Sequence, residues 1–327
     1  MHINSRVEVC EKAYAKINPF LRVGPRQSDG YHPVVTVLQS LELHDDVRIA
    51  VERKAVGPSS VDVLVDDPAL PRGAENLAGK AALRLLERAD VGACLVTIEI
   101  RKRIPVAAGL AGGSSDAAAV LRGLSRALRL DLSQGELLAI AAELGTDVSG
   151  CLVGGTLIGV GRGERVARLK SQRFWWVLAN PGVQLSTPSV YARFDAMDAG
   201  ESWNEGSSGC PLEALAPGFR TCLEEGDVVG LSTRLRNDLQ EPARGLAPEI
   251  CGLIDAMASC GARATLVSGS GPTVAGLAQD EDHARKIADC LQGAAPWVWW
   301  GASMHETIWP VGPIPVETLE DGPLWLN

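Results

Sequence analysis

Residues 105–121, PVAAGLAGGSSDAAAVL, combine residue types that bind phosphate groups. The glycines within residues 109–113 permit backbone conformations closed to other residues and leave the amide groups accessible to a ligand. Serines and an aspartate follow at residues 114–116, and these are good N-cap types, so we expect a helix to begin there. A helix start offers unpaired amide groups and the positive end of the helix dipole. The stretch therefore predicts a loop that holds a phosphate.

A tight strand-to-helix turn that is merely rich in glycine is the simpler interpretation of residues 105–121, since a glycine loop alone is weak evidence. Here, however, glycines, two serines and a long alanine-rich helix follow one another in the order that phosphate binding needs. The stretch is not a Walker loop, because no Gly-Lys-Ser/Thr follows, and it lacks the GxGxxG spacing of dinucleotide-binding folds. We therefore favour a phosphate site of another kind.

Lys16 is a charged residue inside the alternating, strand-like stretch 7–23. A lone lysine there would normally be a solvated residue on an edge strand. Asn18 lies two residues further on, however, and the pair Tyr31-His32 follows a short polar turn. A lysine, an amide, a flat aromatic ring and an imidazole close together are able to form a pocket for a ring and a phosphate.

Asp147 follows the end of a predicted helix at Gly145, among small and apolar residues. A carboxylate in this position is either a cap or turn residue or a catalytic base, and from position alone the turn is the safer interpretation. A second glycine-rich loop, Ser-Gly-Ser-Gly-Pro-Thr at residues 268–273, stands between two predicted strands rather than before a helix.

The elements around these stretches follow from hydrophobic periodicity and from capping residues. In the first half we expect strands at residues 7–23, 34–43, 46–53, 96–101 and 151–163, and helices at residues 76–89, from the glycine loop to residue 128, and at residues 133–144, where Ser133 and Glu136 form a capping-box pattern. In the second half we expect strands at residues 174–179, 264–267, 274–277 and 297–302, and helices near residues 212–223, 227–235, 249–260 and 283–291. Residues 201–211 indicate a mobile surface loop, and the proline-rich tail beyond Trp309 shows little structure.

The composition is that of an ordinary globular protein, since 46% of the 327 residues are hydrophobic and 22% are charged. A chain of this length has room for a large core, and two domains are expected. The formal net charge of -9 argues against a nucleic-acid binder, because no broad basic surface is available. An anionic substrate would therefore be held by local groups, such as backbone amides and single lysines.

The amino-terminal residues lack the apolar core of a signal peptide, and no apolar run is long enough to cross a bilayer, so we expect a cytoplasmic protein without a membrane partner. The 8 cysteines are scattered and form no CxxC pair, which predicts neither a zinc site nor a disulfide framework. Most of them are expected to be small buried residues in a reducing compartment.

Three separated motifs stand in a fixed order, with KIN and DGYH early in the chain, GLAGGSSDAAA in the middle and VSGSGPT late. In this order the chain resembles the GHMP family of small-molecule kinases, and the middle loop matches the phosphate-binding motif of that family. The resemblance covers most of residues 15–277. Two positions depart from the pattern, since Pro19 replaces the usual leucine after KIN, and Ser149 replaces the usual proline two residues after Asp147.

The resemblance implies an α+β fold, the two-domain GHMP kinase fold with the active site in the interdomain cleft. Residues 1–165 would form the amino-terminal domain with the ATP-binding glycine loop, and residues 166–327 the carboxy-terminal domain with the proline-rich tail. The resemblance further implies a need for ATP and Mg2+, with the ion bound largely through phosphates and water rather than at a protein metal site.

The family motifs imply roles residue by residue. Asp147 would take the proton from the substrate hydroxyl, and Lys16 would keep Asp147 ionised and stabilise charge on the transferring phosphoryl group. The residues implied to bind ATP are Asn76, beside the adenosine, and Pro105, Gly109, Ala111, Gly112, Gly113, Ser114 and Ser115. The residues implied to bind the acceptor substrate, with its cytidine end beside aromatic rings, are Asn18, Tyr31, His32, Asp147, Tyr191, Gly269, Ser270, Gly271 and Thr273.

The acceptor that the motifs imply is a small molecule, a cytidine diphosphate-linked methylerythritol that is phosphorylated on its 2-hydroxyl in the non-mevalonate route to isoprenoids. A kinase of the family that acts on a plain alcohol, mevalonate or homoserine, is a second hypothesis, against which Tyr31, His32 and Tyr191 speak because those substrates carry no base. A nucleotide-binding sensor without catalysis is a third hypothesis, against which the presence of Lys16 and Asp147 speaks. A monomer or a homodimer is expected.

Overall fold

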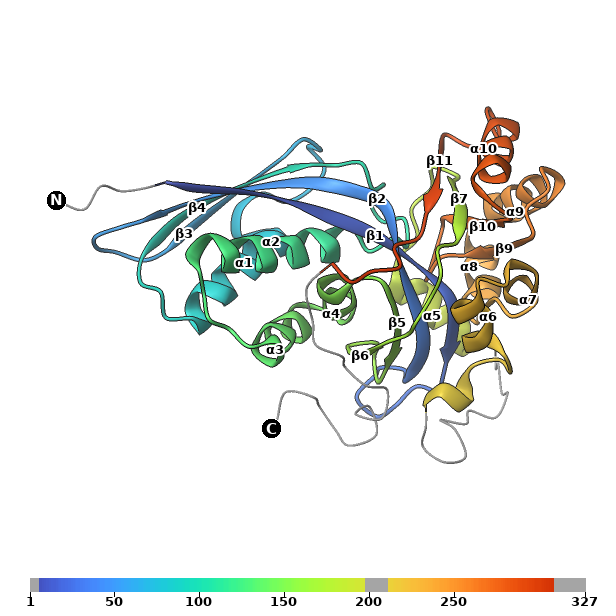
Figure 1. The fold of residues 1–327 in the computed structure, drawn as a ribbon, viewed down its shortest axis with the longest axis horizontal. Coiled ribbons are helices and arrows are strands. Elements are labelled where there is room, and N and C mark those ends of the chain that lie inside the picture. Colours follow the sequence, from blue (N-terminus) through green and yellow to red (C-terminus); the bar gives the residue numbers. More distant parts are fainter. Residues whose placement is uncertain (1–5, 198–210, 309–327) are drawn as a thin grey trace.

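The computed structural model describes residues 6–197 and 211–308, which form two β-sheets with helices packed against them (Figure 1). The first sheet has the strand order β3-β4-β2-β1-β8, and it is extended by β5, which pairs with β2 and β6. Its strands are β1 (Val7–Val23), β2 (Val34–Arg53), β3 (Ser60–Val65), β4 (Cys94–Arg101), β5 (Thr156–Val160), β6 (Arg165–Arg168) and β8 (Arg236–Asn237). The second sheet has the order β11-β7-β10-β9, with β7 (Trp175–Asn180), β9 (Ala264–Val267), β10 (Val274–Ala278) and β11 (Trp297–Ala302).

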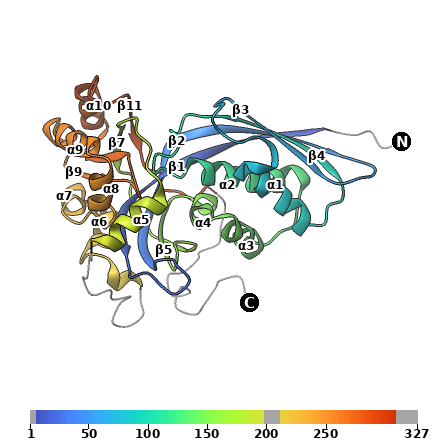
Figure 2. The same ribbon diagram turned by 180° about the vertical axis from the view of Figure 1, so that it is seen from behind.

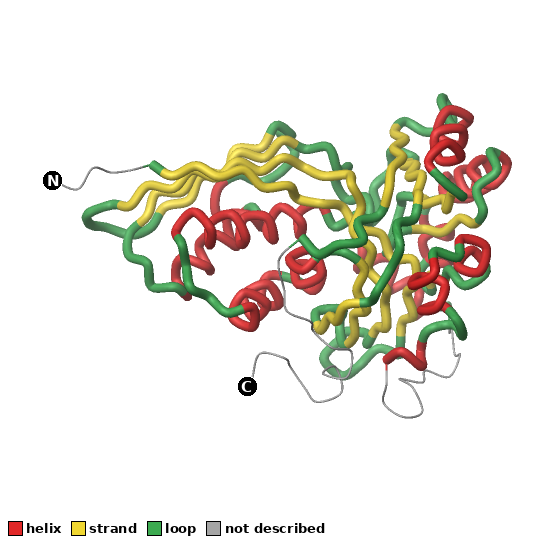
Figure 3. Tube along the Cα trace, in the orientation of Figure 1, coloured by secondary structure: helices red, strands yellow, loops and turns green. Residues whose placement is uncertain are grey.

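β1 and β2 are long antiparallel strands that extend from the far end of the first sheet toward the second sheet (Figure 3). Two strands were expected, at residues 34–43 and 46–53, but they form the single strand β2, because His44 and Asp45 also pair with β1. The buried Asp45 carboxylate accepts hydrogen bonds from the backbone of Arg103 and Ile104. The register of β1 shifts at Lys16 and again between Ile17 and Phe20. Such bulges re-aim side chains, and here they lie beside the lysine of the first motif.

Four helices, α1 (Leu77–Arg88), α2 (Gly112–Leu128), α3 (Gln134–Leu144) and α4 (Thr146–Val153), lie on one side of the first sheet (Figure 2). α1, α2 and α4 contact its strands, and α3 packs on the other helices. The predicted capping box of α3 is confirmed, since the Ser133 hydroxyl accepts from the Glu136 backbone and the Glu136 carboxylate accepts from the Ser133 backbone. A short 3-10 turn, η1 (Gly73–Glu75), precedes α1.

The start of α2 corrects the expectation of a helix beginning at residues 114–116. The N-cap is Ala111, in the left-handed conformation with φ of 57°, and no side chain caps the helix. The expected capping side chains serve other partners, because the Ser115 hydroxyl donates to the backbone oxygen of Tyr14 and Asp116 pairs with Lys102. The first amides of α2 therefore have no side-chain cap.

The second half contains the helices α5 (Thr187–Ala196), α6 (Phe219–Glu225), α7 (Val228–Ser232), α8 (Gln240–Leu246), α9 (Glu249–Ser259) and α10 (Glu281–Cys290), and the turn η2 (Pro211–Ala214). The expected strand at residues 151–163 is wrong at its start, because α4 continues to Val153 and ends where Gly154 and Gly155 both have positive φ. α5 was not expected as a helix, although Pro188 in its first turn favours a helix start.

One hydrophobic core includes residues of both sheets. β8, from the second half of the chain, pairs in parallel with β1 at Phe20 and Leu21, and the Trp176 indole donates to the Gln39 side chain at 2.8 Å. The two halves are thus joined by a strand pair and by buried polar contacts. The division of the chain after residue 165, which would separate β6 from its partner β5, stays a prediction.

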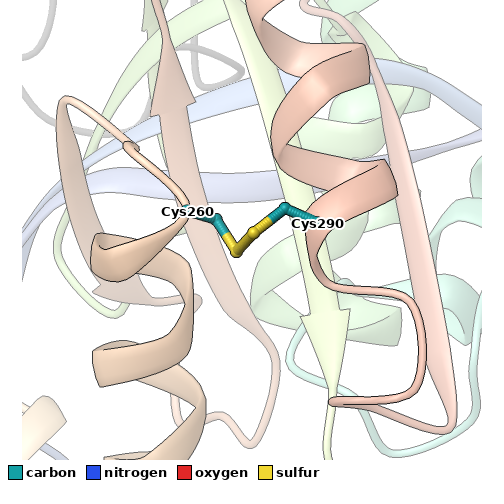
Figure 4. Close-up of a disulfide and its surroundings, with 2 residues drawn as sticks. All are labelled: Cys260 and Cys290. Atoms are coloured by element: carbon teal, nitrogen blue, oxygen red, sulfur yellow. A yellow bond between two sulfur atoms is a disulfide. The ribbon is translucent and has the colours of Figure 1, made fainter.

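Cys260 and Cys290 form a disulfide between the ends of α9 and α10 (Figure 4). The expectation that the cysteines form no disulfide is wrong for this pair. The two residues are 30 positions apart in sequence, and they meet because α9 and α10 both pack on the second sheet. Cys94, Cys151 and Cys222 are buried free thiols, as expected.

Two sequence-based expectations concern segments that are not described. The loop at residues 201–211 lies outside the described residues except for Pro211, and the tail beyond Trp309 lies wholly outside them. Within residues 6–197 and 211–308, each helix is too short or too polar to pass through a bilayer.

Candidate active site

A cavity of about 530 Å³ lies between β1, the glycine loop before α2, the start of α4, α5 and the loop between β9 and β10. Residues from both halves of the chain thus line the same cavity. The predicted site residues that line it are Lys16, Asn18, Asn76, Pro105, Gly109, Ala111, Gly112, Gly113, Ser114, Asp147, Tyr191, Gly269, Ser270 and Gly271.

Lys16 and Asp147 form an ion pair in this cavity. Lys16 Nζ lies 3.5 Å from Asp147 Oδ2 and donates to Asn18 Oδ1 at 2.8 Å. The lysine side chain is buried, whereas the Asp147 side chain is 41% exposed. A carboxylate that is open to the cavity can accept a proton from a bound hydroxyl group, and the buried cation can stabilise charge that develops beside it.

Asn18 fixes the direction of the Lys16 ammonium group. Its Nδ2 donates to Thr36 Oγ1 at 2.9 Å, and the Thr36 hydroxyl in turn donates to the backbone oxygen of Phe20 at 2.9 Å. Because this chain of bonds engages the amide nitrogen, the amide oxygen is the atom that faces Lys16.

The two glycine-rich loops touch each other at Gly109. This residue has φ of 75°, and a Cβ atom placed on it would overlap the backbone oxygens of Ser268 and Gly271. The Ser268 hydroxyl donates to the Gly109 oxygen at 3.0 Å, and the Lys16 amide donates to the Leu110 oxygen at 3.2 Å. The first loop is therefore held between the second loop and β1, next to the lysine.

Two further predicted residues, Ser115 and Thr273, have side chains that point away from the cavity. Ser115 Oγ donates to the backbone oxygen of Tyr14 at 2.6 Å, and Thr273 Oγ1 accepts from Asn180 Nδ2 at 3.0 Å. Both residues are buried, and neither is among the described residues that line the cavity. Their contacts support the backbone of the two loops from behind.

The second loop is also tied to neighbouring elements. Asn237 of β8 donates through Nδ2 to the backbone oxygens of Val267 and Gly269, each at 2.7 Å. The Ser270 hydroxyl lies 2.9 Å from the hydroxyl of Thr187 at the start of α5. The loop therefore has fixed contacts with both sheets and with α5.

Lys102 lines the cavity and was missed by sequence reasoning. Its ammonium group lies 2.8 Å from Asp116 and also pairs with Asp45, and both carboxylates are almost completely buried. Burial raises the pKa of Asp116 to about 7, with Lys102 opposing this rise and Asp45 adding to it. The cluster joins β2, the end of β4 and the first turns of α2 behind the glycine loop. The only feature of the sequence that pointed to this cluster was the position of Lys102 three residues before Pro105, where the glycine-loop stretch begins.

Asn76 lines another part of the cavity, together with Leu70, Pro71 and Leu77. Its Oδ1 caps α1 by accepting from the Ala78 amide at 3.0 Å, and its Nδ2 donates to the Pro71 oxygen at 2.9 Å. An apolar wall with one fixed amide suits a planar, partly polar ring.

His32 and Tyr191 form one aromatic contact, with ring centroids 5.0 Å apart. Only Tyr191 is among the residues that line the cavity, and His32 is buried, with Nε2 2.7 Å from Asp195 Oδ1. Burial, and then the nearby Asp147 carboxylate, raise the pKa of Tyr191 to about 12, so its phenol is neutral at physiological pH.

Tyr31 is 53% exposed and is not among the residues that line the cavity. The guanidinium carbon of Arg162 lies 3.9 Å from the centroid of its ring. Arg162, which sequence reasoning also missed, does line the cavity and pairs with Asp29 at 2.7 Å. No sequence motif contains Arg162. Its position beside the cavity follows only from the folding of the β5–β6 hairpin.

Comparison with known proteins gives matches over most of the chain. A family model described as "GHMP kinases N terminal domain" matches residues 76–155, and one described as "GHMP kinases C terminal" matches residues 219–296. A 4-diphosphocytidyl-2-C-methyl-D-erythritol kinase of Leifsonia xyli subsp. xyli is 43% identical over an alignment of 288 positions, which covers 86% of this chain and 92% of that protein. A protein of the same name from Thermobifida fusca is 37% identical, over 97% of this chain and 100% of the relative.

Solved structures agree with these matches. A crystal structure of a 4-(cytidine 5'-diphospho)-2C-methyl-D-erythritol kinase superposes with a TM-score of 0.71 and 35% identity, covering 90% of this chain and 99% of the other. A homoserine kinase from Cytophaga hutchinsonii superposes with a TM-score of 0.69 over 93% of this chain and 97% of the other. At 18% identity the latter shows a shared fold alone.

Proposed function

The chain belongs to the GHMP kinase family, and from this premise we propose that it transfers the γ-phosphate of ATP to the 2-hydroxyl of 4-diphosphocytidyl-2-C-methyl-D-erythritol. The observation that carries the proposal is the Lys16–Asp147 pair, which faces the same cavity as the two glycine loops. The relatives of that name at 37% and 43% identity support the choice of acceptor and with it a step in isoprenoid synthesis by the non-mevalonate route.

ATP is proposed to bind with its triphosphate on the loop before α2. The glycine backbone there has no side chains in the way, and the first amides of α2 have no side-chain cap, so both favour phosphate oxygens. The residues proposed to contact ATP are Pro105, Gly109, Ala111, Gly112, Gly113 and Ser114, with Ser115 supporting the loop and Asn76 beside the adenosine.

In the proposed reaction Asp147 accepts the proton of the acceptor 2-hydroxyl. The hydroxyl oxygen then forms the new bond to the γ-phosphorus, and the bond from that phosphorus to the oxygen of ADP breaks. Phosphoryl transfer of this kind depends mainly on alignment and on charge neutralisation. The buried ammonium group of Lys16 stabilises the charge that builds up between the hydroxyl oxygen and the phosphoryl group.

The acceptor is proposed to lie on the other side of Lys16 and Asp147. Asn18, Tyr191 and the loop Gly269, Ser270 and Gly271 line that part of the cavity, and Thr273 supports the loop from behind. The Tyr191 ring offers a face for the cytosine, with His32 packed behind it and Tyr31 at the exposed rim.

Magnesium is proposed as the accompanying ion, which when bound neutralises charge on the phosphates. Within the described residues no group of three or more His, Cys, Asp or Glu side chains could hold a metal. This fits an ion held mostly by phosphate oxygens and water, as Mg2+ often is in kinases. Ser114, in the cavity wall at the start of α2, is one residue whose hydroxyl would hold such an ion.

The proposal includes a cytoplasmic location and action as a monomer or homodimer. The location is supported by the nature of the two substrates, which are both charged nucleotides.

A substrate panel tests the function. Release of ADP is followed with 4-diphosphocytidyl-2-C-methyl-D-erythritol, mevalonate and homoserine, each with ATP and Mg2+. Turnover of the cytidine compound alone is the expected result. Turnover of a plain alcohol would instead assign the chain to another kinase of the family, and ATP binding without turnover of any alcohol would favour a sensor.

A further inference from the structure

Arg162 is a charged residue that lines the cavity. It belongs to no sequence motif, and the proposed reaction assigns it no role. Its side chain is 46% exposed, and its guanidinium group lies between the Tyr31 ring, at 3.9 Å, and Asp29, at 2.7 Å. Tyr31 itself is not among the residues that line the cavity. Of the two stacked side chains, the arginine is therefore the one that lines the cavity.

The position of Arg162 is fixed by the turn between β5 and β6. Gly161 and Gly163 both have positive φ, of 74° and 105°, and the Arg162 amide donates to the Glu164 carboxylate at 2.7 Å. The Gly161 oxygen accepts from the amide of Val34, the first residue of β2. The turn is thus held against the first sheet before any ligand arrives.

The Asp29 carboxylate is also fixed in position, because each of its oxygens accepts a hydrogen bond. Its Oδ1 accepts from the Tyr31 amide at 2.9 Å, and its Oδ2 accepts from Arg162 Nη2. The bond from the Tyr31 amide and then the pair with Arg162 lower the pKa of Asp29, so the carboxylate stays charged. With a ring on one side and a carboxylate on the other, the guanidinium group loses little side-chain freedom when a ligand binds.

The cations that line the cavity are Lys16, Lys102 and Arg162. They differ in how many of their N–H donors are already bonded to protein groups. Lys16 is bound to Asn18 and Asp147, and buried Lys102 is shared by two carboxylates. Arg162 is paired with one carboxylate, and its guanidinium group has further N–H donors. In a chain with a net charge of -9, an acceptor that carries a diphosphate needs such a cation.

We propose that the Arg162 guanidinium group binds the diphosphate of the cytidine diphosphate-linked acceptor and so selects it over uncharged alcohols. This inference rests on the proposed function. A guanidinium group forms paired, charge-assisted hydrogen bonds with phosphate oxygens, which an ammonium group reproduces only in part. The exposed ring of Tyr31 keeps the arginine in place and leaves ring surface for the neighbouring base.

The test compares Arg162→Gln and Arg162→Lys with the wild-type chain. Calorimetric titration gives the Kd of CDP and of cytidine, and steady-state assays give kcat and KM for the acceptor and for ATP. For Arg162→Gln we expect the Kd of CDP and the KM of the acceptor to rise about 10- to 100-fold, from the loss of a charge-assisted contact. The Kd of cytidine, the KM of ATP and kcat should change by less than about threefold. Arg162→Lys should restore part of the loss.

Arg168→Gln is the matched control, because Arg168 lies on β6 of the same hairpin, is exposed and is not among the described residues that line the cavity. It removes the same charge, and it should leave CDP binding unchanged. Thermal unfolding of each variant shows whether it is folded. An equal loss of CDP and cytidine binding in Arg162→Gln would overturn the diphosphate assignment, and so would unchanged CDP binding.

The inference and the proposed function fail in different ways. If the wild-type chain neither turns over the acceptor nor binds CDP, the proposed function is wrong and the role of Arg162 falls with it. If the wild-type chain is active and Arg162→Gln has an unchanged KM for the acceptor, only the inference is wrong.

Discussion

Lys16 and Asp147 lie at different depths of the same cavity, and the tasks proposed for them differ accordingly. The lysine is buried and held by Asn18, whereas the aspartate is partly open to the space where a hydroxyl group would bind. A fixed cation and an accessible base are the two groups that the transfer of a phosphoryl group to an alcohol uses.

The substitution Lys16→Gln should lower kcat without abolishing ATP binding. The ammonium group is proposed to stabilise charge that develops only in the transition state, and loss of one such donor lowers kcat by about 10²- to 10³-fold. The glycine loop, which is proposed to hold ATP, keeps its contacts. Steady-state kinetics and calorimetric titration with ATP measure the two effects. Lys170→Gln, at an exposed lysine outside the cavity wall, is the control. A kcat for Lys16→Gln equal to that of the wild type would remove the lysine from the mechanism.

Tyr191 makes stability depend on pH in the alkaline range. Its pKa in the folded chain is raised from the ordinary value of 10.0 to about 12, because burial favours the neutral phenol. The unfolded chain therefore loses this proton first, and the stabilisation, fully present below pH 10, is lost as the pH rises toward 12. Between pH 9 and pH 11, the Tm of the wild type should fall more steeply than that of Tyr191→Phe. Parallel Tm curves would show that the phenol is not buried as described.

At the scale of elements, the contact between the two glycine loops depends on the missing side chain of Gly109. The substitution Gly109→Ala places a Cβ atom against the backbone oxygens of Ser268 and Gly271, and its φ of 75° is unfavourable for alanine. We expect a fall in stability of about 1–3 kcal/mol and a raised KM for ATP, measured by denaturant unfolding and by kinetics.

Gly252→Ala is the matched control for Gly109→Ala. Gly252 lies within α9, its φ is helical, and a Cβ atom on it would meet nothing within 4 Å. Alanine there should stabilise the chain slightly, since it favours the helix. Should both variants have the same stability and the same KM for ATP, the close approach of the two loops would be refuted.

Hydrophobic periodicity predicted most elements, because the strands and helices bury alternating or helical sets of residues. β1, β9 and β11 have the expected bounds, α1 is one residue shorter than expected at each end, and α3 begins one residue later than expected. The errors occur where a local signal was overruled by tertiary contacts. His44 and Asp45, which fell between two expected strands, lie inside β2, where Asp45 is buried and hydrogen-bonded. Residues 151–153, which were expected to begin a strand, form the end of α4.

The candidate site was predictable where a motif carries the residue. Lys16, Asp147 and the glycine loop share a cavity because each stands at an end or bulge of an element near the first sheet. Lys102 and Arg162 were not predictable, since no motif contains either cation and each pairs with a carboxylate far away in sequence, Asp45 and Asp29 respectively. The disulfide was missed for the same reason.

At the scale of the whole molecule, the second half of the chain is stabilised by the link between α9 and α10. The disulfide closes a loop of 30 residues, which in the chain-entropy model stabilises the fold by about 3–4 kcal/mol. Reduction, or the substitution Cys290→Ser, should lower the Tm by several degrees and leave kcat unchanged, because neither cysteine lines the cavity. Differential scanning calorimetry with and without dithiothreitol, on the wild type and on Cys290→Ser, measures this. If reductant left the Tm of the wild type unchanged, the link would have no role in stability.

The whole molecule brings the proposed base, the buried cation and two glycine loops from both halves of the chain into one cavity. This cavity is proposed to phosphorylate the 2-hydroxyl of the cytidine-linked acceptor. The most direct measurement is a single-turnover reaction with ATP, Mg2+ and 4-diphosphocytidyl-2-C-methyl-D-erythritol, in which mass spectrometry follows the phosphorylated product. The wild type should form it, and Asp147→Asn should form it about 10²- to 10⁴-fold more slowly while binding ATP normally. Equal rates for the two chains would contradict the role of Asp147 as the base, and no phosphorylated product from the wild type would contradict the proposed reaction.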